Sequence, residues 1–287
     1  MCDDDIHPGL IDDPTLSRRA FGLIAAATVG LAGAARAAEA VVEKDVDIKT
    51  PDGVADAALF YPVGKGAWPA VLLWPDVISL RPVFREMGRR LAAEGYVVLI
   101  PNLYYRVKHA PVVEGGFNFA NPDDRAKITP MRATVTPDGT VRDATAYMAF
   151  LDAQPQTDTK RKAGVQGYCM GGPLAFQTAA TAPGRIGAVA TFHGAGLVSD
   201  QPGSPHLLIA KTQAEYLILI ADNDDQKDPA AKDTLKAALQ AAGRPGKVEV
   251  YAGAAHGWTV KGGQVYNEAA AEKAWAELLA LYKRALA

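Results

Sequence analysis

The feature that most constrains this chain is a Gly-x-Cys-x-Gly turn between an apolar run and a helix-like run. The turn is Gly167-Tyr168-Cys169-Met170-Gly171, and residues 173–180 follow it as a helix-like segment. This layout is typical of the sharp strand-to-helix turn that lifts a nucleophilic side chain above the edge of a sheet. Gly167 and Gly171 suit such a turn because a β-carbon at either position would collide with nearby backbone. On this motif alone, a buried structural cysteine in a glycine-rich turn is an equal alternative.

Strand-like and helix-like patterns alternate on both sides of this turn. Strands are expected at residues 70–74, 96–100, 162–166, 186–192, 215–221 and 247–251, and helices at 82–94, 138–153, 229–242 and 267–286. This alternation predicts an α/β fold, a mostly parallel sheet with helices on both faces. Residues 40–49 and 55–61, joined by Pro51-Asp52-Gly53, predict an antiparallel hairpin at the N-terminal edge of the sheet.

Residues 102–136 form the longest irregular stretch, rich in Gly, Pro, Asn and aromatic residues. A segment of this length inside a compact α/β domain is usually functional, so we expect a loop or lid.

The first 37 residues have the pattern of an export signal. Arg18-Arg19 precede an Ala/Gly-rich apolar run that ends in Ala35-Arg36-Ala37, a small-x-small cleavage pattern. The run is shorter than the roughly 18 apolar residues of a membrane-spanning helix. It resembles a twin-arginine signal, which implies a periplasmic or secreted domain of residues 38–287, without stable membrane insertion after cleavage. An uncleaved N-terminal anchor is the alternative.

Charge and cysteine content narrow the chemistry. The 30 Lys and Arg residues nearly balance the 32 Asp and Glu residues, and no basic stripe stands out, which argues against a nucleic-acid partner. Cleavage of the leader would remove Cys2 and leave Cys169 as the sole thiol, so neither an internal disulfide nor a Cys-based zinc site is expected. We expect no metal or organic cofactor, and a monomer or small homo-oligomer.

A nucleophilic Cys169 needs a base and a carboxylate that orients the base. In hydrolases with this turn the chain order is nucleophile, acid, His. The strand 215–221 ends in Asp222-Asn223-Asp224-Asp225, and a Gly-bounded loop that contains His256 follows the strand 247–251. Both segments follow the carboxyl ends of strands, where such sites form. The sequence therefore predicts a Cys–His–Asp triad.

Each of these residue types also has a structural alternative. Acidic residues after a strand are common helix N-caps, the role we expect for Asp228 before Pro229. A loop histidine is more often structural or exposed than catalytic. His193 ends the strand 186–192, where it would line the pocket or pack beside it.

Together these residues make the chain resemble the dienelactone hydrolase (carboxymethylenebutenolidase-like) family of the α/β-hydrolase fold. The resemblance rests on four stretches: residues 167–172, residues 91–104, Asp222–Asp225 and Ala255-His256-Gly257-Trp258. It implies Cys169 as nucleophile, His256 as base and Asp224 as acid, with Asp225 as the competing acid. It also implies that Asp76 holds the resting thiol and that the backbone N–H groups of Met170 and Val77 form an oxyanion hole.

The same resemblance bears on substrate binding. Family members that act on dienelactones bind the substrate carboxylate with two arginines, and Arg106 matches one of them. The second is missing, and Lys261 is the candidate replacement, although an ammonium lacks the planar fork of arginine. An ordinary salt bridge is the alternative for Arg106. Tyr104 and Trp258, with His193, are expected to line a partly apolar pocket, and core packing is the alternative for each aromatic.

The predicted function is hydrolysis of ester or lactone bonds in small carboxylic esters through a thioester acyl-enzyme. A thioesterase, amidase or dehalogenase on the same scaffold is the first alternative. A non-catalytic ligand-binding homologue is the second, although a pure binder has no need for an acid and a base.

Overall fold

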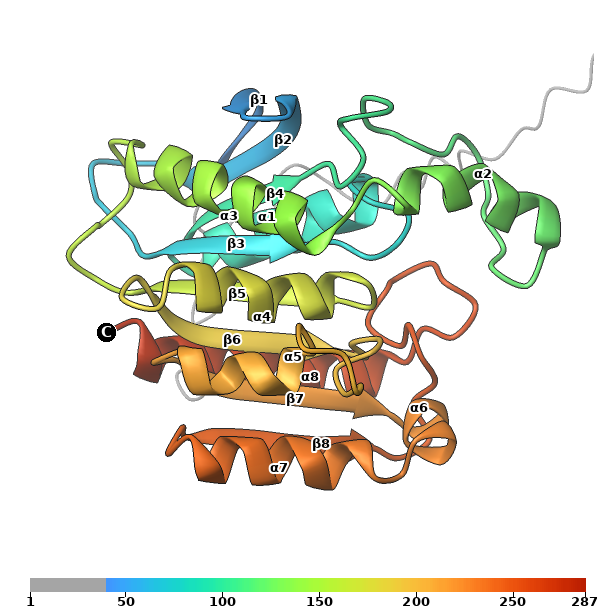
Figure 1. Ribbon diagram of the computed structural model, residues 1–287. Coiled ribbons are helices and arrows are strands. Elements are labelled where there is room, and N and C mark those ends of the chain that lie inside the picture. Colours follow the sequence, from blue (N-terminus) through green and yellow to red (C-terminus); the bar gives the residue numbers. More distant parts are fainter. Residues whose placement is uncertain (1–39) are drawn as a thin grey trace, which may run out of the picture. The chain divides into compact units, whose positions relative to one another are not determined.

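The computed structural model describes residues 40–287, and the leader expected at residues 1–37 lies outside them. A single eight-stranded sheet has the strand order β1-β2-β4-β3-β5-β6-β7-β8 (Figure 1). The strands are β1 (Val41–Thr50), β2 (Gly53–Pro62), β3 (Ala70–Trp74), β4 (Val97–Pro101), β5 (Ala163–Tyr168), β6 (Ile186–Phe192), β7 (Glu215–Ala221) and β8 (Gly246–Tyr251). The helices are α1 (Pro82–Ala93), α2 (Pro122–Arg132), α3 (Pro137–Asp152), α4 (Gly171–Thr181), α5 (Pro205–Leu208), α6 (Asp222–Lys227), α7 (Ala231–Ala241) and α8 (Glu268–Ala285), with a 3₁₀ turn at Ile209–Lys211.

The sheet is mixed but mostly parallel. Strands β3 to β8 pair in parallel, whereas β1 and β2 form an antiparallel hairpin and β2 also pairs antiparallel with β4. Every residue of β3, β4 and β5 is buried. Strands covered on both faces are largely apolar, which explains the continuous apolar runs of β3 and β4. The buried amide of Gln166 in β5 is hydrogen-bonded to the hydroxyls of Tyr168 and Tyr282. The predicted α/β fold with an N-terminal antiparallel hairpin is confirmed.

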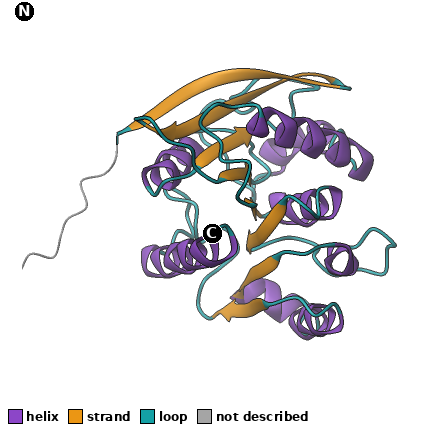
Figure 2. Cartoon of the chain, turned by 90° about the vertical axis from the view of Figure 1, so that its left-hand side faces the viewer, coloured by secondary structure: helices purple, strands orange, loops and turns teal. Residues whose placement is uncertain are grey.

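Helices cover both faces of the sheet (Figure 2). Alternate side chains of a strand point to opposite faces, so Leu72 packs into the core under α3, α4 and α7, while Val71 packs into the core under α1 and α8. The parallel strands β3 to β8 end at the same side of Figure 1, where α2, α6 and the connection between β8 and α8 also lie. Residues that follow strand ends are therefore gathered at one edge.

Two details differ from the sequence expectation. The irregular stretch 102–136 contains a helix, α2, which Asn121 caps by accepting the N–H of Asp123. Asp228 does not cap α7, because it is the C-cap residue of α6, where its N–H donates to the carbonyl of Asp224. Helix α7 begins only at Ala231, one turn later. The acidic run after β7 folds into a helix of its own.

Within residues 40–287, no helix is both long enough and apolar enough to cross a membrane.

Candidate active site

Cys169 sits at a strained turn between β5 and α4. Its φ of 51° lies in the left-handed region, which residues with a β-carbon seldom adopt and which recurs at functional sites. The Cys169 N–H donates to the carbonyl of Phe192 at 3.1 Å, and the Cys169 carbonyl accepts from Gly172 and Ala195, each at 3.1 Å. These bonds anchor the turn to the end of β6.

The glycines on either side of Cys169 are sterically required. A β-carbon on Gly167 would overlap the backbone of Gly171, and one on Gly171 would overlap the backbone of Trp74. Both obstacles are backbone atoms, which cannot rotate away as a side chain can. The steric expectation from the sequence is confirmed, and it explains the Gly-x-Cys-x-Gly spacing.

His256 lies in the loop after β8 and joins Cys169 to Asp224. Its Nδ1 is 2.5 Å from Oδ2 of Asp224, and the ring also hydrogen-bonds the side chain of Cys169. The backbone N–H of His256 donates to the side-chain oxygen of Asn223 at 2.8 Å, which fixes the loop against α6. The three residues lie in the order predicted from the sequence: after β5, after β7 and after β8.

The surroundings of His256 favour its protonated form. Burial lowers the pKa of the imidazole, but the hydrogen bonds to Asp224 and Cys169 and their charges outweigh burial and raise the pKa to about 10. A carboxylate and a thiolate beside the ring each stabilise an imidazolium. The ring can therefore accept a proton from Cys169 and hold it.

The neighbouring carboxylate faces another partner. Both oxygens of Asp225 accept from Nζ of Lys232, at 2.7 and 2.9 Å. Of the two acids left open by the sequence, Asp224 is the one that contacts His256. The two carboxylates point in different directions because Asp224 and Asp225 are consecutive residues of α6, and consecutive residues of a helix point about 100° apart.

The turn after β3 contains Val77, one of the two residues whose backbone N–H groups are expected to form an oxyanion hole. Val77 lines the same cavity as Cys169, and its carbonyl accepts from the hydroxyl of Tyr104 at 2.8 Å. Among residues 40–287, no protein acceptor faces the N–H of Val77 or that of Met170. Met170 precedes the first turn of α4, where backbone N–H groups have no partner within the helix. The oxyanion hole expected at these two N–H groups stays a prediction.

Asp76 lines the cavity as well, but its carboxylate is bound to Arg81. The two guanidinium nitrogens Nη1 and Nη2 donate to Oδ1 and Oδ2 at 2.6 and 2.8 Å. Oδ1 also accepts the backbone N–H of Ile78 at 2.9 Å. No hydrogen bond joins Asp76 to Cys169 in the described part of the chain.

His193 lies beside His256 at the base of the cavity. The two ring centroids are 4.8 Å apart, and Nε2 of His193 is 2.9 Å from the hydroxyl of Thr259. Burial and the charge of His256 hold the pKa of His193 well below its usual range. His193 is therefore a neutral wall of the cavity, held in a left-handed backbone conformation with φ of 42°.

The structure does not bring Arg106 to this cavity. Its guanidinium donates to both oxygens of Asp143, at 2.8 and 2.9 Å, and to Asp52 at 2.6 Å. Arg106 and Asp143 are both largely buried, with 15% and 9% of their side chains exposed. Arg106 therefore forms salt bridges, the alternative to substrate binding, and it joins α3 to the β1–β2 hairpin.

Tyr104 and Trp258 belong to the core and do not line the cavity. Tyr104 is fully buried and supports the turn at Val77. Trp258, two residues after His256, is also fully buried, where it stacks on Tyr251 and meets His193 edge-on. Core packing, the alternative left open for both aromatics, is what the structure shows.

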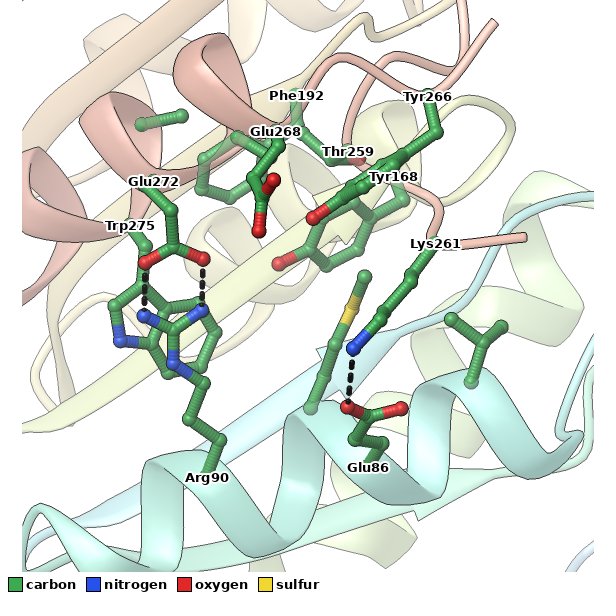
Figure 3. A pocket seen from close by; sticks show the side chains of 14 residues that line it. Glu86, Arg90, Tyr168, Phe192, Thr259, Lys261, Tyr266, Glu268, Glu272 and Trp275 are labelled. Carbon is green, nitrogen blue, oxygen red and sulfur yellow. Dashed lines mark hydrogen bonds and ion pairs between the residues drawn. The ribbon is translucent and has the colours of Figure 1, made fainter. Parts of the chain in front are cut away.

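Lys261 also points elsewhere. It lines a second pocket, between α1 and α8, where its ammonium is 3.5 Å from the carboxylate of Glu86 (Figure 3). The Arg90–Glu272 ion pair lies in the same pocket. Tyr168, Phe192 and Thr259 also line this second pocket.

Several residues that line the Cys169 cavity were not expected from the sequence. They are Ile78, Arg81, Phe117, Phe119, Val260 and Val265. Phe117 and Phe119 lie in the stretch 102–136, whose length and aromatic content were the only signal for them. Arg81 had a weaker signal, a charged residue directly before the helix-starting Pro82. Among residues 40–287, no group of three or more His, Cys, Asp or Glu side chains is placed to hold a metal ion.

This combination of a doubly covered, mostly parallel sheet and a cysteine on a strained strand-to-helix turn defines a hydrolase of the α/β-hydrolase fold. The model of the dienelactone hydrolase family matches residues 55–286. The chain therefore belongs to the dienelactone hydrolase family and is a carboxymethylenebutenolidase-like hydrolase.

Individual relatives agree with this assignment. A Salmonella typhi protein with the provisional name carboxymethylenebutenolidase is 28% identical over 254 residues, covering 81% of this chain and 88% of the relative. A carboxymethylenebutenolidase of Pseudomonas sp. strain P51 is 34% identical over 116 residues, covering 40% of this chain and 46% of the relative. A crystal structure provisionally assigned as a dienelactone hydrolase of Klebsiella pneumoniae shares the fold, with a TM-score of 0.73, 22% identity and coverage of 85% and 99%.

Proposed function

We propose that this protein hydrolyses carboxylic esters or lactones through a covalent thioester on Cys169. The observation that carries the proposal is the unbroken contact from Cys169 to His256 to Asp224 at a strained turn. A thiol needs a neighbouring base to become a nucleophile, and a base needs a group that fixes its ring. The three residues meet both requirements.

In the first half-reaction, His256 takes the thiol proton and the sulfur of Cys169 attacks the carbonyl carbon. The carbonyl oxygen becomes an oxyanion, which the N–H groups of Val77 and Met170 stabilise by hydrogen bonding. Preorganised donors of this kind contribute about 10²–10³ in rate each. His256 then gives its proton to the leaving alkoxide oxygen, the carbon–oxygen bond breaks, and an alcohol and a thioester result.

In the second half-reaction, water replaces the alcohol. Neutral His256 removes a proton from the water, whose oxygen attacks the thioester carbonyl. The carbon–sulfur bond breaks, the sulfur regains the proton from His256, and a carboxylic acid leaves. Asp224 holds the imidazole in one orientation throughout, because its carboxylate binds Nδ1 and leaves Nε2 toward the sulfur.

The test is Cys169-dependent turnover of p-nitrophenyl acetate by the purified protein. Iodoacetamide should abolish hydrolysis in step with alkylation of Cys169, and Cys169→Ala should lack it. Cys2→Ala, made in the uncleaved full-length protein, is the matched control, because it removes the other cysteine of the chain and should leave both activity and inactivation unchanged. Undiminished hydrolysis by Cys169→Ala would rule out the proposed nucleophile. Parallel assays with a thioester, an anilide and a haloalkanoate compare the alternative reactions on this scaffold.

We also propose that the N-terminal segment directs export and is removed near residue 37. The paired Arg18-Arg19, the short apolar run and the small-x-small pattern at residues 35–37 support this proposal. N-terminal sequencing of the protein from the periplasm or medium of an expressing bacterium is the test. A mature N-terminus near Ala38 is expected, and an intact Met1 would contradict cleavage.

A further inference from the structure

The cavity above Cys169 has a largely apolar wall. Ile78, Phe117 and Phe119 contribute to it from the stretches after β3 and β4, and Val260 and Val265 from the loop after β8. The rings of Phe117 and Phe119 pack with centroids 6.2 Å apart. The cavity holds about 400 Å³, which falls within the usual range for small-molecule sites.

Two of these side chains are exposed although they are large and apolar. Phe119 is 52% exposed and Val265 is 43% exposed, and both stand at the mouth of the cavity. Exposed apolar surface beside a reactive group indicates a ligand that covers it, since burial of this surface is favourable. The ligand must therefore present an apolar surface of its own.

Positive charge is scarce in the same cavity. Arg81 is the only Lys or Arg among its described lining residues, and its fork is already occupied by the two oxygens of Asp76 and the carbonyl of Ser79. A substrate carboxylate would have to compete with Asp76, whose charge repels it. Lys261 and Arg106, the two cations expected to bind a carboxylate, are paired with Glu86 and with Asp52 and Asp143.

We propose that the site takes uncharged esters or lactones that carry an apolar chain or ring, which lies against Phe119 and Val265. This inference rests on the proposed function, because it places the reactive carbonyl at Cys169. It assigns Phe119 and Val265 as specificity-determining residues. It also excludes small dicarboxylic esters as preferred substrates, because no unpaired cation awaits their second carboxylate.

The test compares kcat/KM for p-nitrophenyl acetate, butyrate and hexanoate, and for alkyl acetates of increasing alcohol length. In at least one series, kcat/KM should rise about tenfold from the shortest to the longest substrate. Each methylene that is fully buried contributes about 0.8 kcal/mol, or roughly fourfold in kcat/KM. The p-nitrophenyl monoester of adipic acid, which matches the hexanoate in length and adds a carboxylate, should be at least about tenfold poorer than the hexanoate.

Phe119→Ala and Val265→Ala should each reduce the advantage of the long substrate over the short one about threefold or more. Leu207→Ala is the matched control, because Leu207 is 47% exposed but lies on α5, outside this cavity. The inference would be overturned by equal kcat/KM along both series or by a preference for the adipate monoester. It would also be overturned if the advantage of the long substrate over the short one were unchanged in Phe119→Ala and Val265→Ala.

Binding to Cys169→Ala separates this inference from the proposed function. Calorimetry with p-nitrophenyl hexanoate should give a dissociation constant that Phe119→Ala, made in the Cys169→Ala protein, weakens about threefold or more. If binding depends on Phe119 but no ester is hydrolysed through Cys169, the proposed function fails and the apolar preference stands. If hydrolysis depends on Cys169 but chain length has no effect, only the apolar preference fails.

Discussion

Arg81 binds both carboxylate oxygens of Asp76, five residues earlier in the chain, at 2.6 and 2.8 Å. The same carboxylate accepts the N–H of Ile78, and the Asp76 carbonyl accepts the N–H of Ser79. Val77 lies inside the turn that these bonds close. The pair therefore braces the turn that contains Val77, and the thiol contact that the family resemblance implied for Asp76 stays a prediction.

Asp76→Asn and Arg81→Gln should each lower kcat about tenfold or more with a smaller change in KM. An oxyanion donor acts mainly in the transition state, and complete loss of one costs about 10²–10³ in rate. The double variant should be little worse than either single variant, because both remove the same ion pair. Steady-state kinetics on a p-nitrophenyl ester measures all three.

The pH dependence of iodoacetamide alkylation is the control for this prediction. If Asp76 acts through the turn, the alkylation profile of Cys169 should be the same in wild type, Asp76→Asn and Arg81→Gln. A profile that shifts in Asp76→Asn but not in Arg81→Gln would instead indicate direct contact between Asp76 and the thiol.

Asp224→Asn should lower kcat about 10²-fold or more, because an amide at this position no longer holds the imidazole in the tautomer that the reaction needs. Asp225→Asn is the matched control, since Asp225 is the next residue and is bound to Lys232. It should retain nearly full activity under identical assay conditions. Equal losses in the two variants would contradict the assignment of Asp224 as the acid partner of His256.

Arg106→Ala should affect stability and leave substrate preference unchanged. The substitution leaves the largely buried carboxylate of Asp143 without its main partner, although the hydroxyl of Tyr105 still donates to it. The expected loss in free energy of unfolding is roughly 1–3 kcal/mol, measured by urea denaturation. A selective loss of kcat/KM for carboxylate-bearing esters would show that Arg106 binds substrate after all.

His256 should make stability depend on pH. Its pKa is about 10 in the folded protein and near 6.5 for an ordinary histidine, so the folded state binds the proton more tightly. Its contribution to the free energy of unfolding is then complete below about pH 6.5 and is lost as the pH rises toward 10. The difference in unfolding free energy between wild type and His256→Gln, measured in urea from pH 6 to pH 10, should shrink with rising pH. A difference that grows over this range would contradict the raised pKa.

The order of elements could be predicted from the sequence because strands buried on both faces leave short, continuous apolar runs. Cys169, Asp224 and His256 could be placed because each lies shortly after the end of a strand, and the carboxyl ends of parallel strands meet at one edge. The spacing could not decide whether Asp224 or Asp225 is the acid partner of His256, since only the orientation of α6 decides which carboxylate reaches the histidine.

The surroundings of the site could not be predicted in the same way. Arg106 turns toward Asp143, which lies on a distant helix, and Lys261 turns toward Glu86 on α1. Such ion pairs join residues far apart in the chain and leave no local pattern. Phe119 and Val265 face the cavity only because the segments after β4 and β8 converge, which depends on tertiary packing and not on periodicity.

The most direct test is mass spectrometry of the protein quenched in acid during turnover of p-nitrophenyl acetate. One acetyl group is expected on the peptide that contains Cys169, and hydroxylamine at neutral pH should remove it, as it does a thioester. Asp225→Asn should give the same adduct, and Cys169→Ala should give none. Acetylation of a different residue at the rate of turnover, with Cys169 unmodified, would contradict the covalent role of Cys169.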